Sequence, residues 1–314
     1  MQLKKPKFWS YKKPNLLSWI LWPISKFVEL NLILKNKKPK TKFKIKTICV
    51  GNIYVGGTGK TSLAIVIHEI LKKMNIKSCF VKKYYPNQTD EQKILQKYGK
   101  VFLSKSRVES LKEAEHEKFE FAIFDDGLQD YSINFDVKFI CFNSINWIGN
   151  GMVIPSGPLR ENIKNLKSYN NIFISGNIEK SENIIKYIYD INPKINLIFG
   201  TYEPTNLKNF NLNEKYIAFS GIGNHATFIE MLKLNNLKIV KDIEFPDHYE
   251  YSKNDINKII SISKELNCKI ITTEKDFLRL ENHVNQSIKC IKTKLNISDE
   301  QKLINAIFNL DELH

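Results

Sequence analysis

The chain of 314 residues is poor in paired cysteines and in arginine, and each shortage narrows the possible functions. Its five cysteines stand far apart, with no CxxC pair and no adjacent histidine: Cys49, Cys79, Cys141, Cys268 and Cys290. This spacing argues against a zinc site and against a disulfide framework, and it fits a reducing cytosol. The only arginines are Arg107, Arg160 and Arg279, so the net charge of +15 comes almost wholly from lysine.

A charge of +15 suits an anionic partner, such as nucleic acid, acidic lipid headgroups or a phosphorylated substrate. A general drift of composition towards Lys, Asn and Ile gives the same excess, so charge alone does not select a partner. A nucleic-acid binder with a helicase-like core should show basic clusters interleaved with exposed aromatics, whereas the lysines here are scattered. We therefore expect no nucleic-acid partner.

The sequence also lacks an uninterrupted apolar run of the roughly 20 residues that a membrane span requires. The nearest candidate, residues 15–34, is interrupted by Pro23 and several polar residues. On a helical wheel one side of this segment gathers Asn15, Ser18, Ser25, Lys26 and Glu29. The remaining broad face carries Leu, Ile, Trp and Phe, and lysines flank both ends, so residues 1–39 are expected to form a helix in the interface of an anionic membrane. Packing of the helix on its own domain is the alternative, and a signal peptide is not expected because no small-residue cleavage site follows.

Strand and helix patterns alternate from residue 43 onwards. Strands are expected at 43–52, 77–82, 100–104, 119–125 and 137–142, with helices at 62–74 and 107–118. The pattern predicts an α/β fold of the P-loop NTPase type, a mostly parallel sheet with helices on both faces. At 193–215 this alternation gives way to a stretch rich in Asn, Pro and Lys, which indicates a domain boundary. We therefore predict a nucleotide-binding core at 40–205 and a smaller α/β domain at 206–314. The smaller domain should contain strands in YIAFSG, LKIVKDIEF and CKIITTE and a helix in NDINKIISISKEL.

The segment VGNIYVGGTGKTS, residues 50–62, lacks the first glycine of the phosphate-binding pattern GxxxxGK[ST], because Tyr54 stands in its place. The remaining glycines still allow the backbone N–H groups to approach an anion, and the segment lies between a strand and a helix. We expect a nucleotide to be held by Tyr54, Val55, Gly56, Gly57, Thr58, Gly59, Lys60 and Thr61. Lys60 should bridge the β- and γ-phosphates, and the Thr61 hydroxyl should bind Mg²⁺.

A second acidic anchor for the metal is expected in FAIFDDGLQD, residues 121–130. Four apolar residues precede Asp125 and Asp126, which places both carboxylates at the carboxyl end of a strand, where ligands bind in open α/β sheets. We expect one or both to bind Mg²⁺, and Asp126 to take part in catalysis. A solvated turn is the alternative.

The order of these and several other motifs resembles the tetraacyldisaccharide 4'-kinases, which phosphorylate the lipid A precursor in Gram-negative bacteria. The matching stretches run over nearly the whole chain: PKFW, VGNIYVGGTGKTS, TDEQ, DDGLQD, NWIGNGMVIPSGPLRE, FSGIGN, FPDHYEY and TTEKDFLRL. A residue other than glycine at the position of Tyr54 belongs to this family's pattern. The resemblance implies transfer of the ATP γ-phosphate to a lipid disaccharide, with Mg²⁺, by a peripheral protein on the cytoplasmic face of the inner membrane. The oligomeric state is left open, with a monomer expected.

The resemblance also implies roles for residues that the pattern alone leaves unassigned. Asp90 in TDEQ aligns with the carboxylate that helps to deprotonate the sugar 4'-hydroxyl, with Glu91 beside it near the metal. His248 aligns with its dyad partner. Without the resemblance, His248 would be taken as a structural histidine and Asp90 as a helix N-cap.

Acceptor binding is expected near Gln129, Arg160 and Glu161, although an Arg–Glu pair that only holds the GPLRE loop in place is as compatible with the sequence. TTEKD is expected at least to cap a helix. The chain departs from the family at Lys82-Lys83-Tyr84-Tyr85-Pro86, where Ser-Arg-Gly-Tyr-Gly is usual, and at Asp130, which replaces a histidine. The stretch before Asp90 is also shorter than usual.

One further class shares the GGxGKT loop, the switch or partitioning ATPases and GTPases. A guanine-specific member should carry NKxD, and the nearest match, SKND at 252–255, lacks the leading Asn and fits the start of a helix better. This class remains the alternative to a kinase.

Overall fold

The computed structural model describes residues 5–36, 40–84, 89–280 and 287–308, which divide into two compact units. The larger unit is formed by Lys5–Pro86, Leu95–Thr201 and Ile297–His314, and the smaller by Asn87–Ile94 and Tyr202–Asn296. The segment around Asp90 counts with the smaller unit, and the last helix, α9 (Glu300–Phe308), counts with the larger.

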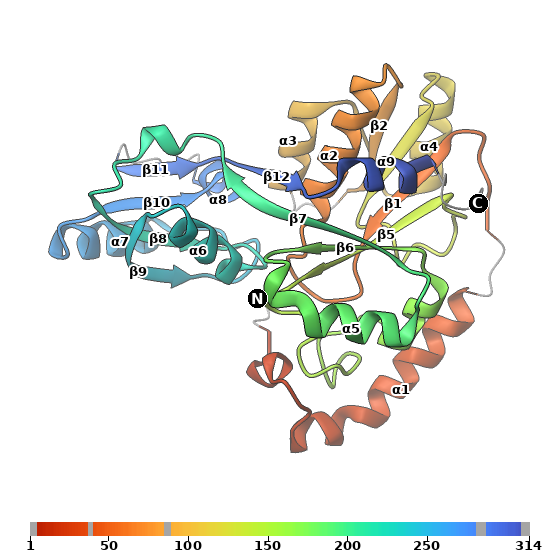
Figure 1. Ribbon diagram of the computed structural model, residues 1–314, viewed down its shortest axis with the longest axis horizontal. Helices are drawn as coiled ribbons and strands as arrows, with labels where there is room; N and C mark the ends of the chain where they lie inside the picture. The colour runs from red at the N-terminus through yellow and green to blue at the C-terminus, as the bar shows by residue number, and fades with distance from the viewer. Residues whose placement is uncertain (1–4, 37–39, 85–88, 281–286, 309–314) are drawn as a thin grey trace. The chain divides into compact units, whose positions relative to one another are not determined.

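The described part of the larger unit is built on an eight-stranded sheet in the order β12-β7-β6-β5-β1-β4-β2-β3 (Figure 1). Residues 202–204 of β7 and 293–296 of β12 count with the smaller unit. The pairs from β7 through to β3 are parallel. The strands are β1 (Lys46–Gly51), β2 (Ser78–Lys83), β3 (Val101–Ser104), β4 (Phe121–Asp125), β5 (Val137–Asn143), β6 (Asn171–Ser175), β7 (Asn196–Pro204) and β12 (Thr293–Ile297). The central strands are buried on both faces, as their continuous apolar sequences require.

Helices cover both faces of this sheet. One face packs against α4 (Arg107–His116) and α5 (Glu182–Ile191), whose apolar residues share a core cluster with Cys49 and Phe124. The helix α2 (Lys60–Lys73) contacts β1, β2 and β4 but contributes none of its buried side chains to that cluster, so it covers the other face. The unit also contains part of α3 (Thr89–Tyr98) and the short 3-10 helices η1 (Lys7–Ser10), η3 (Ile163–Ser168) and η4 (Glu179–Ser181).

The described part of the smaller unit has a four-stranded parallel sheet in the order β11-β10-β8-β9. Its elements are η5 (Leu207–Asn209), β8 (Lys215–Ser220), α6 (His225–Leu234), β9 (Lys238–Glu244), α7 (Lys253–Glu265), β10 (Lys269–Thr273), α8 (Glu274–Arg279) and β11 (Ile288–Ile291). Tyr216 and Ala218 pack with α6, whereas Phe219 packs with α7, so the two helices cover opposite faces.

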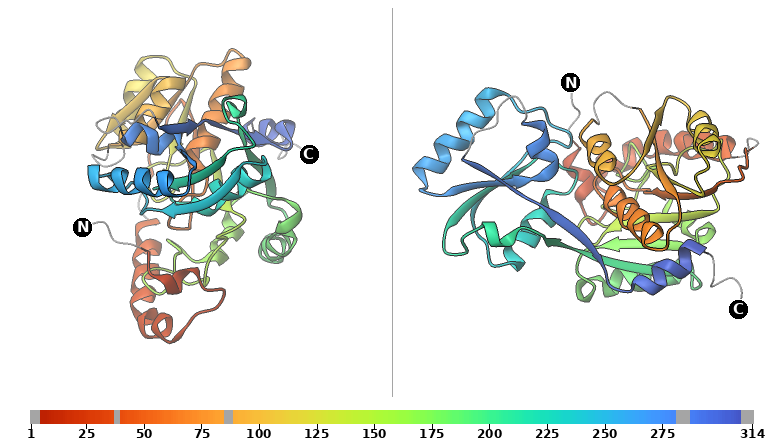
Figure 2. Two further views of the ribbon diagram at one scale, coloured as in Figure 1. Left: turned by 90° about the vertical axis from the view of Figure 1, so that its left-hand side faces the viewer. Right: turned by 90° about the horizontal axis from the view of Figure 1, so that it is seen from above.

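The N-terminal helix α1 (Leu16–Asn36) has an inverted burial pattern. Ser18 and Ser25 are its buried residues, whereas Leu16 is 78% exposed and Phe27 is 72% exposed. The Ser25 hydroxyl donates to the carbonyl of Val153 at 2.8 Å. In Figure 2, α1 lies beside the light-green segment that follows β5. The polar face predicted from the helical wheel is therefore the face that packs on the protein, and the apolar face points away from it. By length and composition α1 could also cross a bilayer.

The predicted fold class is confirmed, and each strand and helix predicted from periodicity lies within two or three residues of its observed bounds. SKND begins α7, where Ser252 and Asp255 form a reciprocal capping box, and TTEKD begins α8 with Thr273 as its N-cap. Tyr85 and Pro86 of the unusual KKYYP segment, and Lys37 and Lys38 after α1, lie outside the described residues.

Candidate active site

The phosphate loop connects β1 to α2 and has the backbone shape that anion binding requires. Gly56 has φ 136° and Gly59, the N-cap of α2, has φ 87°, values that side-chain-bearing residues adopt only with strain. Lys60 and Thr61 form the first turn of α2 behind the loop. Backbone N–H groups at this helix end, together with the positive end of the helix dipole, make the loop a site for phosphate.

Tyr54 fills a structural role at the position where other phosphate loops have glycine. Its side chain is 3% exposed, and its backbone forms an antiparallel bridge to Leu159. The next residue, Val55, donates its N–H to the carbonyl of Pro158 at 2.8 Å. The fully buried Asn52 donates through Nδ2 to the carbonyls of Tyr54 and Gly56 and to the Thr58 hydroxyl. The start of the loop is thus held by extended pairing and by Asn52, so it needs no glycine there.

Asp125, the last residue of β4, lies against the phosphate loop. Its Oδ2 accepts hydrogen bonds from the Thr61 hydroxyl at 3.2 Å and from the Lys82 ammonium at 2.6 Å. Its Oδ1 is buried and has no hydrogen-bond partner among the described residues. A buried carboxylate oxygen without a donor is costly unless a cation binds it. This oxygen and the adjacent Thr61 hydroxyl fit the preference of Mg²⁺ for one or two protein oxygens plus substrate phosphates.

Asp126 has different partners, and its backbone has φ 61°. Its carboxylate accepts from Arg160 Nη1 at 2.9 Å and lies 3.9 Å from Lys60 Nζ. Burial raises the pKa of Asp126, but the charges of Lys60 and Arg160 outweigh it and lower the pKa to about 2. Gln129 joins this group, because its Oε1 accepts from Arg160 at 2.8 Å. Both oxygens of Asp126 thus face cations beside the loop, whereas Asp125 has one oxygen without a hydrogen-bond partner among the described residues.

Asp90 is held in a second cluster, formed within the smaller unit. It lies in the first turn of α3 with a 5% exposed side chain, and its Oδ2 accepts from Arg279 Nη2 at 2.6 Å. Its Oδ1 is 3.5 Å from His248 Nδ1. Burial raises the pKa of Asp90, but the hydrogen bond with His248 and the positive charges of Arg279 and Lys275 outweigh it and hold the pKa well below its ordinary value.

The fully buried Asp276 organises this second cluster. Its carboxylate accepts from the Gly221 N–H at 2.9 Å, the Tyr251 hydroxyl at 2.8 Å and Arg279 Nη1 at 3.1 Å. His248, with φ 58°, donates its backbone N–H to the carbonyl of Gly221. The motifs FSGIGN, FPDHYEY and TTEKDFLRL are therefore linked by one hydrogen-bond network, which fixes Arg279 against Asp90.

Two predicted site residues have other partners. Glu91 pairs with Lys275 at 2.8 Å within the smaller unit. Glu161 is buried and accepts from Asn165 Nδ2 at 2.9 Å and the Tyr169 hydroxyl at 3.0 Å, so it does not form the pair with Arg160 that the sequence left open. Among the described residues, no group of three or more His, Cys, Asp or Glu side chains could hold a metal ion by itself.

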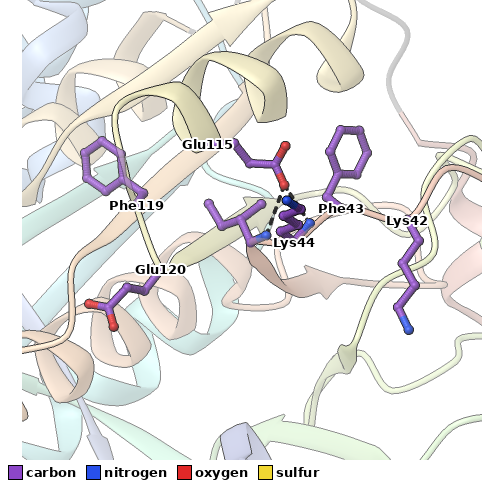
Figure 3. Close-up of a pocket in the computed structure, with 7 residues that line it drawn as sticks. Lys42, Phe43, Lys44, Glu115, Phe119 and Glu120 are labelled. Atoms are coloured by element: carbon purple, nitrogen blue, oxygen red, sulfur yellow. Dashed lines mark hydrogen bonds between the residues drawn. The ribbon is translucent and has the colours of Figure 1, made fainter.

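A surface pocket lies away from these residues (Figure 3). Lys42–Ile45 line it before β1 begins, with Phe119 and Glu120 before β4 and Glu115 from α4. Glu115 accepts the backbone N–H groups of Lys44 and Ile45. The pocket is thus at the amino ends of β1 and β4, opposite to the edge where Asp125 and the phosphate loop stand.

Several residues of both clusters were not predicted: Asn52, Lys82, Arg107, Lys275, Asp276 and Arg279. One signal was available, since the chain has only three arginines among 48 basic residues. Arg160 and Arg279 contact the two predicted catalytic carboxylates, and Arg107 donates to the Asp126 carbonyl at 2.7 Å and pairs with Asp130. Because lysine is the basic residue almost everywhere else in the chain, an arginine indicates a site that needs a planar group with several hydrogen-bond donors.

Comparison with known proteins gives consistent results over the whole chain. The model of a family described as "Tetraacyldisaccharide-1-P 4'-kinase" matches residues 17–310. A protein of Pelagibacter ubique (strain HTCC1062) named "Tetraacyldisaccharide 4'-kinase" is 57% identical over 312 residues, covering 99% of each chain. A protein of the same name from Rickettsia akari (strain Hartford) is 34% identical over 328 residues, covering 98% of each chain.

Among solved structures, the chain is similar to LpxK from Aquifex aeolicus, crystallised in complex with ATP. The TM-score is 0.67 at 22% identity, and the match covers 94% of this chain and 99% of the other. At this identity the likeness shows a common fold, in agreement with the sheets and helices described above.

Proposed function

The chain belongs to the tetraacyldisaccharide-1-P 4'-kinase family, and we propose that its two carboxylate clusters divide the work of one phosphoryl transfer. It is an ATP-dependent kinase that transfers the γ-phosphate of ATP to the 4'-hydroxyl of a tetraacyldisaccharide 1-phosphate, in lipid A biosynthesis. The alternative of a switch or partitioning ATPase or GTPase is thereby excluded.

The larger unit holds the nucleotide in this proposal. Backbone N–H groups from Tyr54 to Thr61 bind the phosphates, and Lys60 neutralises charge on the outer phosphates. The Thr61 hydroxyl and Asp125 Oδ1 would hold Mg²⁺, and the ion would supply positive charge to the phosphate oxygens. Asp126 and Gln129 fix the Arg160 guanidinium, which contacts the phosphates from the side of the GPLRE loop.

The Asp90–His248 pair receives the proton of the 4'-hydroxyl. Asp90 is buried and kept ionised by Arg279, whereas the His248 side chain is 21% exposed and can meet a substrate hydroxyl. We therefore assign proton acceptance to His248 and orientation of its imidazole to Asp90. The observation that carries this assignment is the approach of Asp90 Oδ1 to His248 Nδ1, supported by the Arg279 contact on the other oxygen.

Transfer of labelled γ-phosphate from ATP to tetraacyldisaccharide 1-phosphate in detergent tests the assignment. Asp90→Asn and His248→Gln should each lower kcat by about 10² to 10⁴, the usual contribution of general base catalysis. The smaller unit offers a matched control, a second Asp–His pair in which Asp242 Oδ2 is 3.2 Å from His225 Nε2. Asp242→Asn should keep kcat within about twofold. Undiminished transfer by both Asp90→Asn and His248→Gln would contradict the assignment.

The apolar face of α1 is the proposed docking surface for the anionic inner membrane, on its cytoplasmic side. Ten exposed apolar residues support this proposal: Leu16, Leu17, Trp19, Ile20, Trp22, Ile24, Phe27, Leu30, Ile33 and Leu34. The hydrogen bonds of Ser25 to Val153 and Ser156 favour a helix that lies on the membrane over one that crosses it, because crossing would break them. A protein placed there reaches a substrate whose acyl chains are in the bilayer.

Sedimentation with vesicles containing anionic phospholipid tests this docking. The double substitution Ile20→Glu and Phe27→Glu should reduce the vesicle-bound fraction at least about tenfold, because two exposed apolar side chains that would insert into the membrane become charged. Leu234→Glu is the matched control, because Leu234 is 68% exposed on α6 of the smaller unit. Equal loss in both variants would count against a specific role of α1.

A further inference from the structure

Lys82 is a buried cation on the carboxylate that is assigned to the metal. It lies near the carboxyl end of β2, its side chain is 3% exposed, and its Nζ is 2.6 Å from Asp125 Oδ2. Asp125 is equally buried, with 1% of its side chain exposed. Burial of an ammonium group at this depth is costly unless a carboxylate is paired with it, and Asp125 is that carboxylate.

The Lys82 contact falls on the same group of atoms that a divalent ion would use. Asp125 Oδ2 accepts both the Lys82 ammonium and the Thr61 hydroxyl, and Oδ1 of the same carboxylate is the buried oxygen without a hydrogen-bond partner among the described residues. A divalent ion held by Thr61 and Asp125 therefore meets an ammonium group on one shared carboxylate. In a site this buried, repulsion between the two cations is poorly screened.

We propose that Lys82 is an internal counter-ion that competes with the divalent cation for Asp125, so that Mg²⁺ enters this site together with ATP and not before it. The proposal rests on the metal site of the proposed function. Lys60 and Arg160 add further positive charge beside the loop, in contact with Asp126. The triphosphate supplies the negative charge that offsets these cations, and it gives the displaced ammonium an anionic partner. Lys82 thereby sets the order of binding.

Binding of Mn²⁺ alone to the full-length protein, followed by the loss of the free-ion EPR signal, tests the competition. In the absence of nucleotide, Lys82→Met should bind Mn²⁺ at least about tenfold more tightly than the wild type, because the competing charge is gone. Lys83→Met is the control, because it removes the same charge from the next residue of β2, whose side chain points to the other face of the sheet. It should change Mn²⁺ affinity by less than about twofold.

Two further measurements keep the test decisive. The wild type should bind Mn²⁺ weakly without nucleotide, and a dissociation constant in the low micromolar range would overturn the proposal even if Lys82→Met failed to fold. The double variant Lys82→Met/Asp125→Asn removes both buried charges, and it should lose the gain in Mn²⁺ affinity. Retention of that gain would also overturn the proposal.

Equilibrium dialysis of Mn²⁺ with ATP in both compartments separates failure of this inference from failure of the metal site, because it counts only the Mn²⁺ that the protein holds in addition to the Mn²⁺–ATP complex. If the wild type binds Mn²⁺ with ATP, and Asp125→Asn abolishes that binding, the metal site stands. An unchanged Mn²⁺ affinity in Lys82→Met would then reject the counter-ion role alone. If Asp125→Asn binds Mn²⁺ with ATP as the wild type does, the metal site itself is rejected, and the counter-ion role with it.

Discussion

In the larger unit two acidic residues stand together at the end of one strand, whereas in the smaller unit the partners of Asp90 come from segments separated by more than a hundred residues. Asp125 and Asp126 meet Lys60, Lys82 and Arg160. Asp90 meets His248 and Arg279, which Asp276 and Gly221 hold in place. In both clusters the carboxylates are paired with lysine or arginine side chains.

The difference between the clusters lies in their charge balance. Around the phosphate loop, three cations contact two carboxylates, which leaves positive charge for an anionic ligand. Around Asp90, the two cations Arg279 and Lys275 are outnumbered by three carboxylates, so the cluster has no surplus of positive charge to attract a phosphate: Asp90, Asp276 and Glu91. This difference supports the proposal that the first cluster binds the nucleotide phosphates and that the second accepts the proton of the 4'-hydroxyl.

Among the residues of the cluster around the phosphate loop, loss of Lys60 should give the largest effect on activity. Lys60→Ala should lower the rate of phosphoryl transfer by about 10³-fold, because a preorganised cation on the transferring group is removed. Lys72→Ala, at the exposed end of the same helix, is the control and should leave the rate within about twofold. Indifference to Lys60→Ala would remove the distinction between the clusters.

Loss of Arg279 should give the largest effect on stability. Arg279→Met leaves Asp90 and Asp276 buried without their shared cation, and breaking such a pair costs about 3 kcal/mol or more. Hydrogen exchange of the β8 and β10 amides in urea measures the effect in the smaller unit. Lys264→Met, at an exposed position of α7, should change the free energy of opening by less than about 0.5 kcal/mol. Equal protection in the two variants would show that Arg279 does not hold the cluster together.

The depressed pKa of Asp126 should appear in the acid stability of the protein. Its pKa is lowered from 3.8 to about 2, so its contribution to stability is present above pH 3.8 and is lost as pH falls through 2. The shift corresponds to about 2 kcal/mol. Unfolding free energies of wild type and Asp126→Asn should therefore converge by about that amount between pH 5 and pH 2. Parallel curves would show that Lys60 and Arg160 do not stabilise this carboxylate.

The smallest effect is expected at Glu161, next to Arg160 in sequence but bonded to Asn165 and Tyr169. Glu161→Gln should keep the transfer rate within about threefold, because the amide oxygen can accept from Asn165 and the amide N–H can donate to the Tyr169 hydroxyl oxygen. Arg160→Ala should lower the rate by about 10²-fold, since its guanidinium faces the phosphate site. Equal losses at the two positions would restore the predicted contact of Glu161 with substrate.

The first cluster could be predicted from the sequence, because each of its motifs is a short contiguous stretch of the chain. A glycine-rich turn before a helix and two aspartates after an apolar strand each predict their own position at the carboxyl edge of the sheet. Lys82 was missed, because a lysine near a strand end is usually solvated and only the structure shows it buried on Asp125. For α1 the helical wheel predicted which residues form the polar face. It did not predict that Ser25 on this face would bond to Val153 and Ser156.

The second cluster could not be derived from spacing. Asp90 and His248 were paired only through the resemblance to a family, and nothing in the local sequence of TTEKDFLRL indicates that Asp276 is fully buried or that Arg279 reaches Asp90. Contacts between residues so far apart in the chain depend on the packing of the whole unit.

The division of labour between the clusters is tested most directly by the affinity for ATP of Lys60→Ala and Asp90→Asn, measured by calorimetry under the same conditions. Lys60→Ala should bind ATP at least about tenfold more weakly than the wild type, whereas Asp90→Asn should bind it within about twofold of the wild type while transferring phosphate slowly. A loss of ATP affinity in Asp90→Asn as large as that in Lys60→Ala would contradict the account.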